Sequence, residues 1–222
     1  MATPCFLVIE LPGEYAGHAR VPDELAQRVR AAGGEALAWA PPGRVAGLEP
    51  GSVAAGLLVA RWPDRAAAVT AAKRELLPAL GRAIPAGSTP LVLAIEGLPD
   101  EGLPGMLDIP TTASVRRPAS SRGNVLLLIR GSAWDQARLD RYRDIILPMH
   151  KERGGYYEVF AVAPGQVEAL SGEWTEQILA ISRWPTRAAA EDFWYSDRYQ
   201  TEAIPIRLGA GRFTVHMLEA AA

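Results

Sequence analysis

Cysteine is almost absent from this sequence, since Cys5 is the only one among 222 residues. A single thiol excludes an internal disulfide, a Cys-x-x-Cys redox pair and a cluster of thiolate metal ligands. Lysine is nearly as scarce, because Lys73 and Lys151 are the only lysines among 23 cationic residues. Arginine in their place, with much alanine, glycine and proline, is typical of a GC-rich genome and suggests a bacterial source.

Long apolar runs, a signal peptide and a basic stripe are also missing. No run approaches the roughly 20 apolar residues that span a bilayer. The N-terminus lacks the basic residues and long apolar core of a secretory signal. Acids and bases are interspersed and the formal net charge is −2, whereas nucleic-acid binders usually carry a basic stripe. We therefore expect a soluble, cytoplasmic protein that binds neither nucleic acid nor membrane.

The sequence does contain one phrase that occurs twice. Residues 61–68 read RWPDRAAA, and residues 183–190 read RWPTRAAA. Each copy follows an apolar run and precedes an alanine-rich stretch, with Asp64 or Thr186 placed as the N-cap of a helix. Two strand-to-helix turns of nearly the same sequence predict two similar halves.

Each half alternates apolar runs and helical stretches in the order β-α-β-β-α-β, the ferredoxin-like arrangement. We expect segments 45–48 and 167–170 each to continue the second strand of their own half. We expect the segment 195–205 to be irregular. In the first half we expect strands at 5–11, 36–40, 53–62 and 91–95 and helices at 21–32 and 64–80. In the second half we expect strands at 124–130, 156–162, up to 184, and 213–218, and helices at 134–153 and 186–195.

Residues 97–123 differ from both halves, because they hold four prolines among Gly, Ser and Thr and show no periodic apolar face. They are interpreted as a linker, whose apolar patch 106–109 could dock on one half. The predicted domains are then 1–96, linker 97–123, and 124–222. The central strands are apolar on both faces, and helices can cover only one face of each sheet, so the other face must be buried against the other half. The predicted fold is α+β: two ferredoxin-like βαββαβ units packed sheet to sheet as an intrachain pseudo-dimeric α+β barrel.

The second half resembles domain-of-unknown-function family 1330, part of the dimeric α+β-barrel superfamily. The resemblance is carried by GGY at 154–156, VEALSGEW at 167–174, WPT at 184–186, WYSDRYQ at 194–200 and IPIRL at 204–208. The first half has no counterpart of 194–200, so it resembles a degenerate copy, and the chain resembles a tandem repeat of the family. The family has no established activity to carry over. Relatives in the superfamily include cofactor-free monooxygenases, muconolactone isomerases and haem enzymes, and a shared fold is weak support for shared chemistry.

Two histidines are the candidate catalytic acid or base. His150 falls at the buried edge of a predicted helix, and His216 lies in the last strand on the face opposite Phe213 and Val215. The alternative for both is a core histidine satisfied by a hydrogen bond. No HxH or HxxxH spacing exists, and a haem would need one of these two as its proximal ligand. We expect no metal and no cofactor; His18 is interpreted as a bystander.

Aromatic and arginine side chains around the second half are the candidate substrate-binding residues. They would form an apolar pocket with phenol donors and an anion clamp, and the alternatives are core packing and ordinary salt bridges. The predicted set is Tyr156, Arg183, Trp194, Tyr195, Tyr199 and Arg207. The first half has Val29 where the second has His150, so a single site in the second half is expected.

Two functions of different classes fit these features. One is a small cofactor-independent enzyme, monooxygenase- or isomerase-like, acting on a small aromatic or carbonyl compound. The other is a non-catalytic small-molecule-binding or structural module. An enclosed pocket that holds a histidine beside tyrosines would favour the enzyme. The sequence leaves open a homodimer through the outer surfaces.

Overall fold

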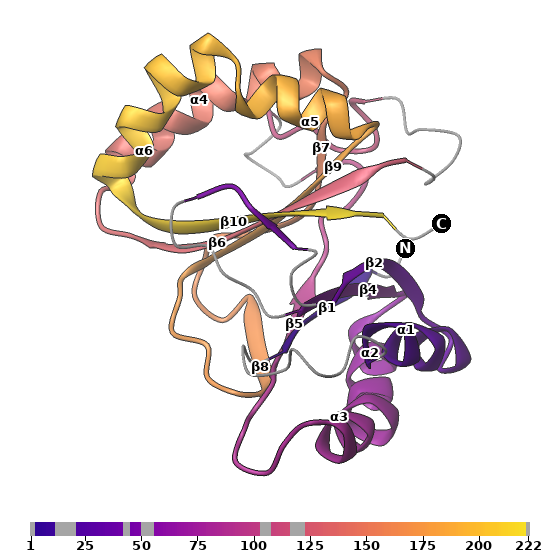
Figure 1. Cartoon of the computed structure of the whole chain (residues 1–222). Helices are drawn as coiled ribbons and strands as arrows, with labels where there is room; N and C mark the ends of the chain where they lie inside the picture. The colour runs from indigo at the N-terminus through magenta and orange to yellow at the C-terminus, as the bar shows by residue number, and fades with distance from the viewer. Residues whose placement is uncertain are drawn as a thin grey trace.

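Two five-stranded antiparallel sheets face each other, and helices cover the outer side of each sheet (Figure 1). This architecture comes from a computed structural model that describes residues 3–11, 21–41, 45–49, 56–102, 108–115 and 123–220. The layers run helix, sheet, sheet, helix. The predicted sheet-to-sheet α+β barrel within one chain is therefore confirmed.

Each half contributes four strands in the ferredoxin-like order, with its first and third strands in the centre. The sheets are β2-β4-β1-β5 and β7-β9-β6-β10, each with one strand added at its end. The first half contains β1 (Cys5–Leu11), α1 (Val21–Ala31), β2 (Glu35–Ala40), β4 (Gly56–Trp62), α2 (Arg65–Ala71), η1 (Ala72–Leu76), α3 (Leu77–Ala83) and β5 (Leu91–Glu96). The second contains β6 (Val125–Ala133), α4 (Gln136–Glu152), β7 (Tyr156–Ala161), β9 (Ile178–Trp184), α5 (Arg187–Trp194), η2 (Tyr199–Ala203), α6 (Ile204–Ala210) and β10 (Gly211–Glu219).

The added strands are exchanged between the halves. From the first half, β3 (Ala46–Gly47) pairs with β10, and from the second half, β8 (Val167–Ser171) pairs with β5. The expectation that these segments continue the second strand of their own half is wrong. Both β5 and β10 end a four-stranded sheet, where unpaired backbone groups would otherwise remain. Pairing across the barrel satisfies those groups and interlocks the two halves.

The repeated phrase forms equivalent strand-to-helix turns, as predicted. The Asp64 carboxylate accepts a hydrogen bond from the Ala67 amide at 2.8 Å, and the Thr186 hydroxyl accepts one from Ala189 at 3.1 Å. Both side chains therefore cap their helices.

The tryptophan of each turn packs on a glycine that follows the preceding helix. A Cβ atom built on Gly34 would lie 2.4 Å from the Trp62 ring, and one on Gly155 would lie 2.9 Å from the Trp184 ring. Gly33 and Gly154, which directly precede these glycines, each end a helix with a positive φ, +78° and +73° respectively. The same Gly-Gly and Trp pairing thus fixes both copies of the turn.

The second helix of each half contains a π-helical turn, η1 or η2, that runs directly into α3 or α6. Pro78 and Pro205 stand in the first turn of the following α-helix. A proline is tolerated there because the amides of a first turn lack partners within the helix. The segment 195–205, which was expected to be irregular, is therefore largely helical.

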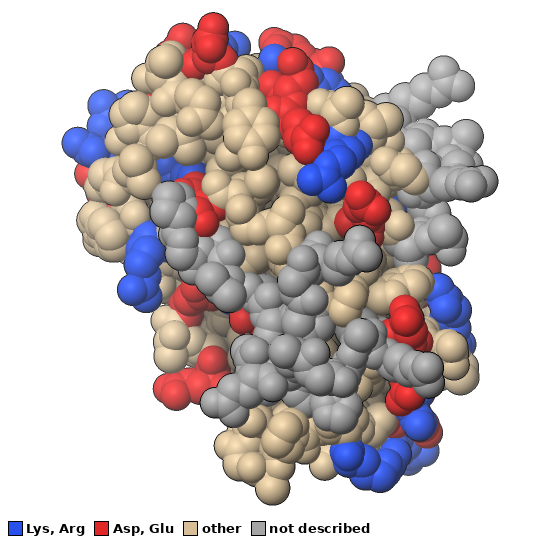
Figure 2. Space-filling view, viewed as in Figure 1, with Lys and Arg blue, Asp and Glu red and all other residues tan. Residues whose placement is uncertain are grey.

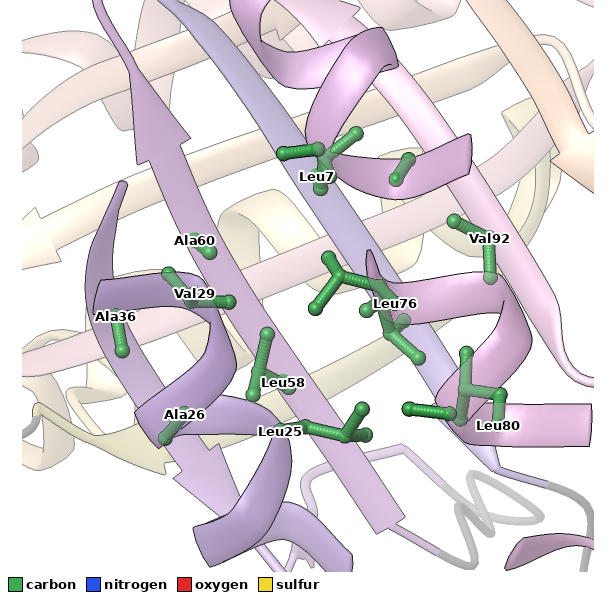
Figure 3. Packing of buried hydrophobic residues seen from close by; sticks show 14 of the residues in the cluster. Leu7, Leu25, Ala26, Val29, Ala36, Leu58, Ala60, Leu76, Leu80 and Val92 are labelled. Carbon is green, nitrogen blue, oxygen red and sulfur yellow. The ribbon is translucent and has the colours of Figure 1, made fainter. Parts of the chain in front are cut away.

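Apolar cores lie both between the sheets and beneath each helical layer. In the first half, Leu25, Val29, Leu76 and Leu80 fill the space between the helices and the sheet (Figure 3). All four are buried aliphatic side chains. Val29 and His150 each precede their positive-φ glycine by four positions, so the first half places a plain core residue where the second places an imidazole.

Two apolar side chains of the segment 97–123 lie against the second half. Leu98 and Ile109 are buried beside Leu147 and Tyr157. The Tyr157 amide donates to the Pro110 carbonyl at 2.8 Å. The end of the predicted apolar patch thus docks on the second half, whereas Met106 lies outside the described residues, as does His18.

Charges of both signs are interspersed on the face shown in Figure 2. Within the described residues, none of the helices has the length and apolar character that crossing a bilayer requires.

Candidate functional site

A cavity of about 370 Å³ lies between the second half's sheet and its helices α4, α5 and α6. Four of the residues predicted for the site line it, namely His150, Trp194, Tyr199 and Arg207. Its floor is formed by side chains of β6, β7 and β9, including Ile129, and aromatic, aliphatic and charged side chains from the helices form the remaining wall. The volume is at the lower end of the range for small-molecule sites.

Helix α4 supplies one wall through a stripe of residues at steps of three and four. Leu139, Tyr142, Ile146 and His150 all line the cavity. This spacing places side chains above one another on one helix face. The last member of this stripe, His150, is the titratable one, and the sequence placed it at the buried edge of the helix.

The His150 ring is buried and held on several sides, with 2% exposure. It stacks on Tyr157, with ring centroids 4.9 Å apart, and contacts Phe193 at 4.4 Å and Trp184 at 4.7 Å. Its Nδ1 lies 2.9 Å from the Ile146 carbonyl oxygen. Because a carbonyl can only accept, Nδ1 carries the proton and Nε2 of the neutral ring keeps a lone pair. Burial lowers the pKa of His150 to about 4, so the ring is neutral at pH 7.

His216 lies on the opposite face of the same sheet. Its neighbours Val215 and Met217 belong to the core under the helices, whereas Leu218, two positions away, faces the other sheet. His216 is 1% exposed, and neither ring nitrogen has a hydrogen-bond partner. Burial, with the nearby Arg130 charge, lowers its pKa to about 4. The two candidate histidines are thus not part of one site.

Tyr156 and Arg183 are also absent from the lining of the cavity. They lie opposite each other in the β7–β9 register. The Arg183 guanidinium donates to Glu158 at 2.8 and 3.4 Å, and both side chains are buried. Arg183 is therefore engaged in a structural ion pair at the end of the barrel, and a second cavity of about 470 Å³ borders Glu158 and Arg61 there.

Tyr195 points away from the cavity, although its neighbour Trp194 lines it. Tyr195 caps the C-terminal end of α5 and is 64% exposed. A helix turns by about 100° per residue, so adjacent side chains face different directions. The predicted set therefore divides into four residues at the cavity, three on the other sheet face, and one at the surface.

Tyr142 and Tyr157 also line the cavity, although neither belongs to the predicted substrate-binding set. The Tyr142 and Tyr199 hydroxyls are 3.0 Å apart and hydrogen-bonded across the cavity. Burial raises the pKa of Tyr142, Tyr157 and Tyr199, so each phenol stays protonated. Tyr142 could have been found from its place eight residues before His150 on one helical stripe. The alternation of β7 indicates Tyr157 less clearly, because a bulge follows it.

Arg207 enters the cavity from α6 and is surrounded by aromatic rings. Its guanidinium lies 5.2 Å from the Trp194 ring, 5.8 Å from Tyr142 and Phe213, and 6.0 Å from Tyr199. These are cation–π distances. Burial lowers its pKa to about 10, which still leaves it charged at neutral pH. Its charge is paired with the carboxylate of Glu49.

No group of three His, Cys, Asp or Glu side chains that could hold a metal ion occurs within the ranges that the structure describes. The side chains of the cavity itself offer a neutral imidazole, a pair of phenols and an arginine among apolar walls.

Comparison with known families identifies the half of the chain that holds this cavity. Residues 125–221 match the family described as Domain of unknown function (DUF1330). We refer to this matched part of the chain as the DUF1330 domain. This confirms the resemblance seen in the sequence. A comparison with curated proteins found no match.

Two of the solved structures that match the whole chain have TM-scores above 0.5. One is a "putative monooxygenase" from Fusobacterium nucleatum subsp. nucleatum, with 6% identity and a TM-score of 0.52; the match covers 100% of this chain and 94% of that one. The other is an anthrone oxidase-like protein, with 13% identity, a TM-score of 0.52 and coverage of 100% and 92%. At these identities the likeness shows the fold: the DUF1330 domain and the first half together correspond to one chain of each neighbour.

Proposed function

We propose that the cavity of the DUF1330 domain binds a small aromatic or carbonyl compound and that His150 removes a proton from it. The observation that carries this proposal is a neutral, buried imidazole whose unprotonated nitrogen is fixed by the Nδ1 contact to Ile146. Proton removal is the first step shared by an isomerisation and by a cofactor-independent oxidation with O₂. The proposal therefore covers both reaction types.

The orientation of the base supports this role. A general base must present its lone pair in a defined direction, and the rings of Tyr157, Trp184 and Phe193 leave the imidazole little freedom. A base with a pKa near 4 is weak in isolation. The negative charge that forms on a bound substrate would favour the imidazolium, because opposite charges attract strongly in an enclosed site.

The phenol pair supports binding of an oxygen-bearing substrate. The Tyr142 and Tyr199 hydroxyls form a hydrogen bond to each other, which leaves one of the two protons free to donate to a ligand oxygen. A carbonyl or phenolate oxygen placed there would receive that proton as charge develops. The aromatic walls suit a planar ring system.

Two structural neighbours of the whole chain carry the names "putative monooxygenase" and anthrone oxidase-like protein, and these names agree with an oxidative outcome. Within our proposal, the carbanion left by proton removal is oxidised by O₂ and forms a carbon–oxygen bond to a peroxide, which takes the proton from His150 to give a hydroperoxide. In the isomerisation, the carbanion takes that proton back at another carbon. Partition between these outcomes depends on the substrate.

A non-catalytic binding module is the second candidate. The pKa of His150, about 4, favours it, because such a neutral histidine can serve as a core residue and hydrogen-bond acceptor without gaining a second proton. In that case the cavity would bind the same compounds and release them unchanged.

Deuterium exchange separates the two candidates. The protein is incubated in D₂O with two- and three-ring keto and hydroxy aromatics, while exchange at acidic C–H positions is followed by NMR and O₂ uptake by an electrode. We expect His150→Gln to lower exchange at least about 100-fold. His216→Gln is the matched control, since it replaces an equally buried histidine on the other sheet face, and it should retain exchange. If a compound binds and its deuterium exchange is not accelerated, the non-catalytic binding module is the function that remains. If no compound binds, the proposed site is refuted.

Three further features are proposals of the same kind. The matching topology of the halves and the twice-occurring turn support a tandem repeat in a bacterial protein. We also propose a cytoplasmic location. A homodimer is a prediction that sedimentation equilibrium would check.

A further inference from the structure

The first half reaches into the site of the second half through one side chain. After β3 has paired with β10, the Leu48 amide donates to the Val215 carbonyl at 2.8 Å, and Leu48 packs on the core under the second half's helices. The next residue, Glu49, meets Arg207. The carboxylate is 11% exposed and the guanidinium 3%, so the pair is largely removed from water.

This pairing determines the charge that a ligand would encounter. Arg207 lines the cavity and Glu49 does not, so the cation stands at the wall with its counter-ion behind it. Taken together the two groups are neutral. A ligand carboxylate at Arg207 would displace Glu49 or leave it buried without its partner, and an uncompensated buried charge costs several kcal/mol.

The more exposed charges that line the cavity also disfavour an anionic ligand. Arg143 lies 3.6 to 3.8 Å from the carboxylates of Asp108, Asp140 and Asp144. Of this cluster, Arg143 and Asp140 line the cavity, and both side chains are partly exposed. One cation among three carboxylates leaves an excess of negative charge, which opposes the approach of an anion.

We propose that Glu49 is a specificity-determining residue that makes the cavity selective for uncharged ligands over carboxylates. The inference rests on the proposed function of the cavity and adds the charge class of its substrate. It replaces the expectation that Arg207 meets a negative charge on the substrate. Arg207 instead positions the aromatic wall, and its charge is neutralised by the other half of the chain.

Two nearly isosteric probes test the charge preference by calorimetry at pH 7. 2-Naphthamide is uncharged and 2-naphthoate is an anion. We expect the wild-type protein to bind the amide at least about tenfold more tightly than the carboxylate, the factor of a single charged hydrogen bond. Glu49→Gln should raise the affinity for 2-naphthoate about tenfold and change that for 2-naphthamide less than about twofold. Glu49→Asp, which keeps the charge, should keep the preference of the wild type.

Glu168→Gln is the matched control. Glu168 belongs to the reciprocal strand β8 and pairs with Arg65 of the first half, away from the cavity. Its replacement should leave both affinities unchanged. The double variant Glu49→Gln/Arg207→Gln removes both charges and should again reject 2-naphthoate.

Equal or tighter binding of 2-naphthoate by the wild-type protein would overturn the inference, and this measurement needs no variant to fold. An unchanged preference in a folded Glu49→Gln protein would overturn it as well. If neither probe nor any compound of the aromatic panel binds, the proposed function of the cavity fails instead.

Discussion

The hydroxyl of Tyr142 on α4 and that of Tyr199 on η2 lie 3.0 Å apart, and their hydrogen bond joins the two helical segments across the cavity. The rings are tilted by 59° with centroids 6.4 Å apart, so the contact is made through the hydroxyls rather than by stacking. A bound ligand oxygen would compete for one of these protons.

Replacement of Tyr199 by Phe is expected to weaken binding of hydroxy and keto aromatics about tenfold, because one hydrogen bond to the ligand is lost. Thermal stability should fall by about 1 kcal/mol, since Tyr142 loses its partner. Tyr195→Phe is the control, because this exposed phenol lies outside the cavity. Equal effects of the two changes in a binding titration would show that the Tyr142–Tyr199 pair does not contact the ligand.

The glycines beneath the two tryptophans should resist substitution. Gly34→Ala and Gly155→Ala each place a Cβ atom within 3.0 Å of the ring of Trp62 or Trp184. Overpacking of this kind costs about 1–3 kcal/mol in chemical denaturation. Gly81→Ala in α3 has no atom within 4 Å of its new Cβ atom and should stabilise the protein by about 0.5–1 kcal/mol. Destabilisation by all three would argue against the tryptophan contact as the cause.

Acid should destabilise the protein as pH falls from 6.5 towards 4. The pKa of His150 and of His216 is lowered from 6.5 to about 4 in the folded state, so the unfolded chain binds more protons in this window. Each histidine thus contributes stability that is present above pH 6.5 and lost as pH approaches 4, with a slope of up to about 1.4 kcal/mol per pH unit.

Urea unfolding at several pH values checks this with His216→Leu. In this variant the free energy of unfolding should depend less steeply on pH, because one histidine fewer takes up a proton on unfolding. At pH 7 the variant should be as stable as the wild type or more stable, because an unpartnered polar ring is replaced by an apolar side chain. A slope unchanged by the substitution would mean that His216 titrates normally in the folded protein.

The buried ion pair of Glu158 and Arg183 is expected to contribute more to the free energy of unfolding than the more exposed pair of Glu35 and Arg61. Glu158→Gln leaves the Arg183 cation buried without a counter-charge and is expected to cost about 3–5 kcal/mol. Glu35→Gln breaks the pair with Arg61, in which the acid is half exposed, and should cost less than about 1 kcal/mol. Denaturant titration of both variants gives the comparison, and similar losses would contradict the assigned burial.

We propose that the chain divides into units 1–96 and 124–222 joined by 97–123. Because β3 and β8 are exchanged, each unit lacks the edge strand that the other supplies. Residues 1–96 and 97–222 expressed together should copurify as a one-to-one complex, while each alone should be unfolded or aggregated. Two fragments that fold independently and do not associate would refute this division.

Much of the fold was determined by local sequence. The caps at Asp64 and Thr186, the Gly-Gly pairs and the apolar runs each act within a few residues, so periodicity and turn chemistry predict them. The repetition of residues 61–68 at 183–190, 122 positions later, indicated two equivalent units before any contact was known. The α4 stripe that ends at His150 belongs to the same class of local pattern.

Only the tertiary structure decided how the halves join and which side chains meet. A short strand such as β3 does not encode its partner, because backbone hydrogen bonds are the same at any free sheet edge. His216 could not be separated from His150 by sequence, since the face that a strand turns towards the helices depends on the whole barrel. The pairing of Glu49 with Arg207 joins residues far apart in the chain, and it exists because strand exchange carries the first half into the second half's helical layer.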